Sequence, residues 1–256
     1  MGGMQKGAAL VTGGANRIGA YLVHRLAERG FAVGIHFRSS DKQARRLAED
    51  IGGKGGTAVA LQADLNDRHS RGGLIAAAVE ALGPLSVLIN NASLYDRDDL
   101  QGLDESLWDA HMSVHVEAPI FLARDFARQL PDEITGSIIN LVDARVLTPA
   151  PAFFSYGLSK AALWQATTTM AQALAPRIRV NAIGPGATLP DPGQSEEDFA
   201  RKAKNLPLGR AANPSAVGDA MMYLLGAEAV TGQFIAVDGG KHIAWPEGRG
   251  AAPPEE

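Results

Sequence analysis

The sequence contains no cysteine and no long apolar run, and aromatic residues make up only 6% of its 256 positions. Without cysteine the chain has no disulfide, no thiolate nucleophile and no cysteine ligands for zinc, which is typical of a reducing compartment. No stretch of about 18 consecutive apolar residues occurs, so the sequence predicts no transmembrane helix. We therefore expect a soluble, cytoplasmic protein with no membrane partner and no metal site.

A surplus of positive charge is also lacking. Lysine and arginine together number 24 and aspartate and glutamate 28, which gives a formal net charge of −4. Nucleic-acid binding needs clustered cations that neutralise phosphates, and no such cluster is visible. With 46% hydrophobic residues the chain can bury a sizeable core, and we expect a small molecule as its partner rather than a nucleic acid.

Short apolar runs alternate with longer segments of helical periodicity. The runs predicted as strands are residues 8–12, 32–37, 57–62, 86–90, 137–142, 178–183 and 233–237. The segments predicted as helices are residues 18–29, 40–51, 69–82, 107–130, 156–174 and 214–225. This order predicts a doubly wound α/β fold, a Rossmann fold with a parallel seven-stranded sheet in a single domain. We expect that domain over residues 1–245, a flexible tail over 246–256, and a loop over the proline-rich stretch 184–210.

A glycine-rich turn follows the first predicted strand. Residues 12–19 read Thr-Gly-Gly-Ala-Asn-Arg-Ile-Gly and lead directly into an amphipathic helix. Glycine permits the tight bend, and the free N–H groups at a helix N-terminus favour a phosphate group. A turn in this context, between a strand and a helix, predicts a dinucleotide site.

The end of the second strand indicates which dinucleotide binds. Residues 34–40 read Gly-Ile-His-Phe-Arg-Ser-Ser, with no acid before Asp41 that would repel a 2′-phosphate. Arg38 offers a planar guanidinium and Ser39 a hydroxyl for that phosphate. We therefore predict NADP(H) as the cofactor. The alternative is that these two residues only begin a solvated helix.

Several motifs, in this order, resemble the short-chain dehydrogenase/reductase family over nearly the whole chain. They are the glycine turn, Asp64, Asn90-Asn91-Ala92-Ser93, Tyr156-x-x-x-Lys160, Gly184-Pro185-Gly186, Val230-Thr231-Gly232-Gln233 and Val237-Asp238-Gly239-Gly240. The resemblance implies that Asp64 binds the adenine, that Asn91 lines the cofactor channel and that the Gly-Pro-Gly loop covers the nicotinamide. The cofactor-binding residues expected on these grounds are Gly13, Asn16, Arg17, Ile18, Gly19, Arg38, Ser39, Asp64, Leu65, Asn91, Ala92, Tyr156, Lys160, Pro185 and Gly186. From the residues alone, Asp64 could also be a helix N-cap.

Tyr156 and Lys160 lie four residues apart on a predicted helix, so their side chains share one face. An ammonium close to the phenol would favour the phenolate and lower the tyrosine pKa, which is ordinarily about 10. The tyrosine would then be a usable proton donor near neutral pH. The pair is our candidate for the catalytic centre of an oxidoreductase.

Asp143 departs from the family pattern, which usually has a serine at this place before the tyrosine. An ionised carboxylate would repel the alkoxide formed from a ketone, whereas it suits a substrate that gains a proton on nitrogen. The change resembles the pteridine reductase branch of the family and implies a pterin-like substrate with a C=N bond. The alternative is a structural acid paired with Arg145.

Three more residues agree with that branch. Arg17 and Ser93 stand where the wider family usually has glycine, and Tyr95 stands where the branch has an aromatic that stacks on the pterin. The resemblance therefore implies that Arg17, Ser93, Tyr95 and Asp143 bind the substrate. Arg17 could instead only neutralise a cofactor phosphate, and Tyr95 could be ordinary packing.

His115 stands where the family usually has an asparagine that holds a water in the proton relay behind the lysine. Imidazole could hold the same water, or could itself exchange protons near neutral pH. We therefore place His115 with Asp143, Tyr156 and Lys160 among the catalytic candidates. The alternative is a buried histidine satisfied by the backbone.

The predicted function is an NADPH-dependent reductase acting on the C=N bond of a pterin-like substrate. Two alternatives stay open: a general NADP(H)-dependent carbonyl or ketone reductase, and a non-catalytic NADP(H)-binding sensor. The resemblance also implies a homotetramer. Exposed apolar stripes on the helices over residues 107–130 and 156–174 would be its physical reason.

Overall fold

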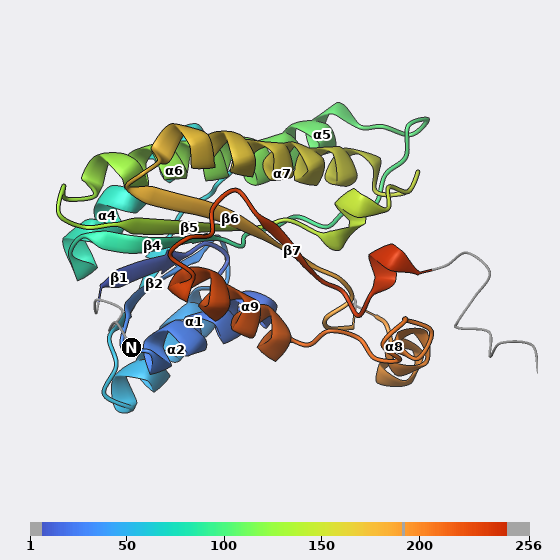
Figure 1. Ribbon diagram of the computed structural model, residues 1–256, viewed down its shortest axis with the longest axis horizontal. Helices are drawn as coiled ribbons and strands as arrows, with labels where there is room; N and C mark the ends of the chain where they lie inside the picture. The colour runs from blue at the N-terminus through green and yellow to red at the C-terminus, as the bar shows by residue number, and fades with distance from the viewer. Residues whose placement is uncertain (1–6, 191–192, 245–256) are drawn as a thin grey trace, which may run out of the picture.

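A parallel sheet forms the centre of the computed structural model, which describes residues 7–190 and 193–244 (Figure 1). Within these residues the sheet has seven strands in the order β3-β2-β1-β4-β5-β6-β7. The strands are β1 Ala8–Val11, β2 Ala32–Phe37, β3 Ala58–Gln62, β4 Leu85–Asn90, β5 Gly136–Leu141, β6 Ile178–Pro185 and β7 Phe234–Val237. The order confirms the predicted doubly wound Rossmann fold. It reverses between β1 and β4, where the connections diverge and leave a crevice at the carboxyl ends of the strands.

Helices cover both faces of the sheet. They are α1 Arg17–Glu28, α2 Asp41–Gly53, α3 Arg68–Gly72, α4 Leu74–Leu82, α5 Glu105–Met112, α6 Ala118–Gln129, α7 Phe154–Leu174, α8 Glu196–Ala203 and α9 Pro214–Gly226, with short turns η1 Ser113–Glu117, η2 Ala144–Leu147 and η3 Lys241–Ile243. Figure 1 shows α1, α2 and α9 on one face and α4, α6 and α7 on the other. No helix among the described residues has the length and apolar character needed to span a bilayer.

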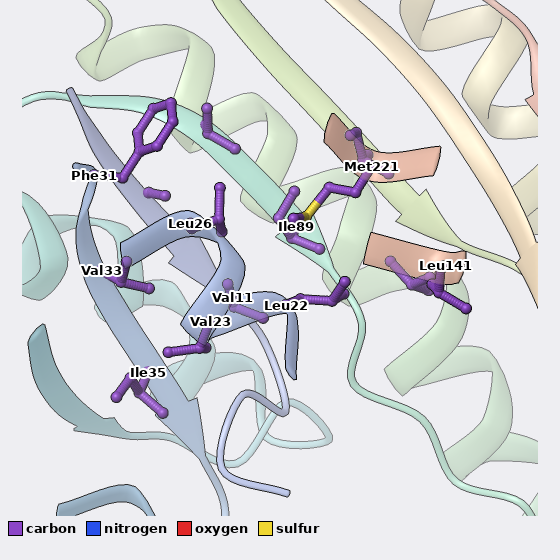
Figure 2. Close-up of a cluster of buried hydrophobic side chains, with 14 of the residues drawn as sticks. Val11, Leu22, Val23, Leu26, Phe31, Val33, Ile35, Ile89, Leu141 and Met221 are labelled. Carbon is purple, nitrogen blue, oxygen red and sulfur yellow. The ribbon is translucent and has the colours of Figure 1, made fainter. Parts of the chain in front are cut away.

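The core has two layers because successive strand residues point to opposite faces. On one face, Val11 and Ile89 pack with Leu22 of α1 and Met221 of α9 (Figure 2). On the other face, the cluster contains Leu10, Leu88 and Ile138 together with Leu122 and Phe126 of α6. Both layers are needed to bury β1 and β5 completely, and this burial fixes the strand ends that carry the site.

Three predicted segments differ from the structure. The helix expected over 107–130 is α5 and α6 joined by the π-helical turn η1, and the helix expected over 69–82 is the pair α3 and α4. The stretch predicted as a loop over 184–210 contains α8. Its signals were in the sequence, since the Ser195 hydroxyl accepts from the Asp198 N–H and acids fill the first turn. The predicted tail over 246–256 lies outside the described residues.

The start of α1 packs so closely on the glycine turn that Gly19 has no room for a side chain. A Cβ there would lie 2.1 Å from the Gly13 carbonyl oxygen, whereas a Cβ at Gly52 in α2 would meet nothing within 4 Å. Gly19→Ala is expected to lower the free energy of unfolding by about 1–3 kcal/mol because the turn must shift. Gly52→Ala is the matched control and is expected to raise it by up to about 1 kcal/mol. Urea unfolding followed by circular dichroism measures both, and equal stability of the two variants would contradict the close packing.

Candidate active site

The crevice at the carboxyl ends of the strands contains two adjoining cavities, which share Ser93. The larger, of about 440 Å³, is lined by Arg17, Ile18, Asn91, Ser93, Tyr95, Asp143, Tyr156, Lys160, Pro185 and Gly186 among others. The smaller, of about 210 Å³, is lined by Gly13, Asn16, Arg38, Ser39, Asp64, Leu65 and Ala92 among others. The fold therefore brings almost every candidate residue to one crevice. Gly19 lies behind it against Asn91, and His115 is buried beside it.

The glycine turn is held in place by a histidine that sequence reasoning missed. The Gly13 N–H donates to His36 Nδ1 at 3.0 Å, and His36 Nε2 lies 3.1 Å from the Ala63 carbonyl oxygen, to which it donates. Burial lowers the pKa of His36 to about 4, against a smaller opposing effect of the Ala63 hydrogen bond. His36 is therefore neutral at physiological pH, and its Nδ1 lone pair orients the turn.

Asn91 ties the turn to the end of β4. Its side-chain amide donates to the carbonyl oxygens of Thr12 at 2.9 Å and Gly13 at 3.0 Å. The Thr12 hydroxyl oxygen in turn accepts from the backbone N–H groups of Asn91 and Ala92. Both amide hydrogens of Asn91 thus hold the protein backbone, so this residue shapes the cavity as well as lining it.

Asp64 and Arg17 have clear local partners. Asp64 accepts from the Asn66 N–H at 2.9 Å, while the N-cap of α3 is Asp67, so the alternative that Asp64 caps that helix is wrong.

Arg17 begins α1 in the left-handed region, at φ 50°. Both terminal nitrogens of its guanidinium donate to the Pro190 carbonyl oxygen at 3.1 Å. Arg17 therefore links the glycine turn to the segment after β6.

The end of β5 holds both members of the tyrosine–lysine pair. The Tyr156 hydroxyl donates to Asp143 Oδ2 at 2.8 Å, and Lys160 Nζ donates to the Leu141 carbonyl oxygen at 2.9 Å. The other carboxylate oxygen of Asp143 accepts from the Arg145 backbone N–H at 2.7 Å. Asp143 is thus held by the backbone of Arg145 rather than by its guanidinium, and one carboxylate oxygen faces the phenol.

The electrostatics of the pair differ from the sequence-based expectation. Burial, and next the charge of Asp143 and its hydrogen bond, raise the pKa of Tyr156 well above its ordinary value. Burial also lowers the pKa of Lys160 to about 8, and Asp143 opposes this only in part. The expectation of a lowered tyrosine pKa is wrong here, because burial and the Asp143 carboxylate both raise it. Tyr156 is a neutral hydroxyl at physiological pH.

His115 has protein partners at both ring nitrogens. Its Nδ1 lies 2.8 Å from the Ser159 hydroxyl, and its Nε2 accepts from the Leu94 N–H at 3.0 Å, with the Ser93 hydroxyl also 3.0 Å away. Burial, together with the positive charge of Lys160, lowers its pKa well below the ordinary value. These contacts favour the interpretation of a buried, neutral histidine held by its neighbours. A role in proton exchange stays a prediction.

A second histidine, which the sequence did not reveal, repeats this arrangement one turn earlier. His111 Nδ1 lies 2.6 Å from the Ser155 hydroxyl, and its ring stacks on that of His115 at 5.4 Å. The Ser155 hydroxyl donates to the Asp98 carboxylate. Two histidines of α5 and η1 therefore pair with two serines of α7 on either side of Tyr156. No sequence signal couples helices so far apart in the chain.

Aromatic rings pack together at the wall of the larger cavity. Tyr95 stacks on Phe153 at 4.6 Å and meets the Tyr156 ring edge-on at 5.0 Å. The Arg145 guanidinium lies 4.8 Å from the Phe153 ring centre and donates to the Tyr95 hydroxyl at 2.9 Å. Phe153, which adopts a left-handed backbone at φ 61°, was not predicted as part of the site. The packing of Tyr95 on Phe153 leaves its ring at the cavity wall, 41% exposed.

Comparisons with known proteins agree with this geometry. The family model described as short chain dehydrogenase matches residues 7–200. An uncharacterized oxidoreductase of Methylorubrum extorquens is 33% identical, over 91% of this chain and 96% of its own. A 3-oxoacyl-(acyl-carrier-protein) reductase of Staphylococcus aureus is 30% identical, over 92% and 98%. The solved structure of FolM alternative dihydrofolate reductase 1 from Brucella canis, complexed with NADP, is 47% identical, covers 93% of this chain and 95% of its own, and has a TM-score of 0.89.

Lys160 makes the stability of the fold depend on pH. Its pKa of about 8 in the folded chain, against an ordinary 10.5, means that the unfolded chain binds more protons between these values. Stability therefore rises with pH through this window, by roughly 3 kcal/mol for complete titration. Tyr156 acts in the opposite sense above about pH 10, because its pKa is raised.

We expect Lys160→Met to be more stable than the natural chain at pH 7 and to lack the rise between pH 8 and pH 10. Removing the buried ammonium removes its desolvation penalty, and only one hydrogen bond is lost. Urea unfolding at a series of pH values measures this, with the exposed Lys204→Met as the control. A rise in stability that persists in Lys160→Met would mean that another group titrates.

Proposed function

The chain belongs to the short chain dehydrogenase family, and we propose that it is a reductase acting on the C=N bond of a pterin-like substrate. It is an NADP(H)-dependent oxidoreductase on a Rossmann fold. The observation that carries the proposal is the carboxylate of Asp143, which accepts the hydrogen bond of the Tyr156 hydroxyl at 2.8 Å. Membership of an oxidoreductase family sets aside the alternative of a non-catalytic sensor.

The residues of the crevice fit the cofactor. The glycine turn is a cradle that side chains would fill, since a Cβ on Gly13 would lie 2.9 Å from Ala92 Cα. The N–H groups at the start of α1 and the Arg17 guanidinium would hold the pyrophosphate. Arg38 and Ser39 line the smaller cavity, where they would hold the 2′-phosphate, with Asp64 at the adenine. NADPH, when bound, supplies the hydride.

Tyr156 is suited to donate the proton. Its raised pKa keeps the hydroxyl protonated at physiological pH, and burial excludes water from it. When hydride reaches the carbon of a C=N bond, electron density develops on the ring nitrogen, which becomes basic enough to take the proton of this hydroxyl. Lys160 would hold the cofactor ribose, and its positive charge would stabilise the phenolate left behind.

Asp143 would orient the substrate. Its carboxylate can accept hydrogen bonds from the amino and ring N–H groups of a pterin, whereas it would repel an alkoxide forming from a ketone. Arg17, Ser93 and Tyr95 line the same cavity and complete the proposed substrate site, with the Tyr95 ring available for offset stacking. The name of the Brucella relative, an alternative dihydrofolate reductase, supports a substrate with a reduced pterin ring.

Reduction of a carbonyl is the second candidate, because the Staphylococcus aureus relative is named a 3-oxoacyl reductase. The carboxylate of Asp143 beside the phenol speaks against it for the reason given above. Two further expectations stay predictions: a cytoplasmic location and a homotetramer. Ile120 and Phe121 on α6 and Leu158 on α7 are between 37% and 45% exposed and would form the apolar contact of a tetramer.

Asp143→Ser is expected to lose reduction of dihydropterins by at least about 100-fold in kcat/KM, because a hydroxyl cannot anchor the amino edge of the ring as a charge-assisted acceptor does. The same variant is expected to gain reduction of small ketones. NADPH oxidation with dihydrobiopterin, dihydrofolate and a ketone panel measures both activities. Pterin turnover retained in Asp143→Ser would reject the proposed role, and ketone turnover alone in the natural chain would favour the second candidate.

Arg38→Leu is expected to raise KM for NADPH by roughly 10- to 100-fold, because a charge-assisted hydrogen bond to the 2′-phosphate is lost. The KM for NADH, which lacks that phosphate, is expected to change little. Arg46→Leu on the exposed face of α2 is the matched control. An equal effect on both dinucleotides would place Arg38 outside the phosphate site.

A further inference from the structure

The larger cavity is basic, although the chain as a whole is acidic. Among the described residues that line it, the cations are Arg17, Arg145, Lys160, Lys202 and Lys241, and the only acid is Asp143. The chain itself carries a formal net charge of −4. A cavity with one sign of charge and low-dielectric walls concentrates ligands of the opposite sign. The basic character of this cavity therefore favours an anionic ligand.

The cofactor accounts for only part of this charge. Arg17 lies in the glycine turn, and Lys160 of α7 reaches the carbonyl oxygen at the end of β5, where the proposed dinucleotide binds. The other three cations, Arg145, Lys202 and Lys241, come from η2, α8 and η3. We call these three the outer cations.

The segments that carry the outer cations pack together on one side of the cavity. The turns η2 and η3 are in contact, and the Leu208 N–H, beyond α8, donates to the Gly239 carbonyl oxygen at 3.1 Å just before η3. Figure 1 shows α8 and the red turn after β7 at the same end of the sheet. The outer cations thus line one cavity although they are far apart in the sequence.

The outer cations have no carboxylate partner among residues 7–190 and 193–244, whereas the neighbouring Arg201 pairs with Asp198 at 2.6 Å. The Arg145 guanidinium is held by uncharged groups, the Tyr95 hydroxyl and the Phe153 ring, which orient it without an ion pair. Three like charges on adjoining segments repel one another, so an anion between them is stabilising.

We propose that the substrate carries a carboxylate or phosphate on the side chain of its ring, and that Arg145, Lys202 and Lys241 bind this group. The inference rests on the proposed function and extends it from the ring to its substituent. A guanidinium can bind either anion through two hydrogen bonds, and the lysines act as point charges. The protein therefore prefers anionic dihydropterins to those with a neutral hydroxyalkyl side chain.

The first experiment compares matched substrates at saturating NADPH. Dihydroneopterin, its phosphate ester and dihydrofolate offer the same reduced ring with a neutral, a phosphate and a carboxylate side chain. We expect kcat/KM to be roughly tenfold higher for an anionic substrate at low ionic strength, and the preference to shrink as salt is added. Equal values for neutral and anionic substrates overturn the inference and leave the proposed function intact. Turnover of ketones but of no dihydropterin overturns the proposed function itself.

The second experiment tests the residues. The double variant Lys202→Gln with Lys241→Gln is expected to lower the preference for the anionic substrate by roughly tenfold. Lys204→Gln, exposed one residue beyond α8 and outside the cavity lining, is the control and keeps the preference. A preference unchanged in the double variant overturns the assignment, and a raised KM for NADPH with unchanged preference shows that these lysines bind the cofactor instead.

Discussion

The hydrogen bond from the Tyr156 hydroxyl to the Asp143 carboxylate is the interaction around which the site is built. It joins the first turn of α7 to the residues after β5, and the bond from Lys160 to the Leu141 carbonyl oxygen repeats that link one helical turn later. Two bonds four residues apart fix both the height and the rotation of α7 against the sheet. This docking places the phenol and the ammonium side by side in the larger cavity.

Burial shifts the pKa values of Tyr156 and Lys160 in opposite directions. It raises the pKa of the Tyr156 phenol and lowers that of the Lys160 ammonium, because it disfavours the charged form of each. The ammonium nitrogen is 5.8 Å from the phenol ring centre, while the carboxylate oxygen is 2.8 Å from the hydroxyl. Burial and the carboxylate together keep the proton on the phenol, and burial, which Asp143 opposes only in part, brings the lysine close to neutrality at mildly alkaline pH. A protonated donor beside a carboxylate matches a substrate whose nitrogen becomes basic as it is reduced.

The sequence predicted the features that repeat along the chain and those confined to short motifs. All seven strands were predicted because short apolar runs between turns are typical of buried strands. Asp143 and Asn91 follow the ends of two such strands, and both line the crevice. Pairings across distant elements were not predictable. The bonds of His111 to Ser155 and of His36 to Gly13 depend on how helices and strands pack, which no local spacing encodes. The π-helical turn at His115 was missed because its apolar period resembles that of an ordinary helix.

Backbone strain among the described residues gathers at this same crevice. Arg17 and Phe153 are the two non-glycine residues there with positive φ, a conformation that costs an L-residue roughly 1–2 kcal/mol. Each gains a contact that glycine could not make: the Arg17 guanidinium reaches the Pro190 carbonyl oxygen, and the Phe153 ring supports Tyr95 and Arg145. The first contact joins the start of α1 to the segment after β6, and the second joins the segment before α7 to two residues that line the larger cavity. The contacts of these two side chains at the site offset the unfavourable backbone conformation, which local conformational preference alone would not predict for either residue.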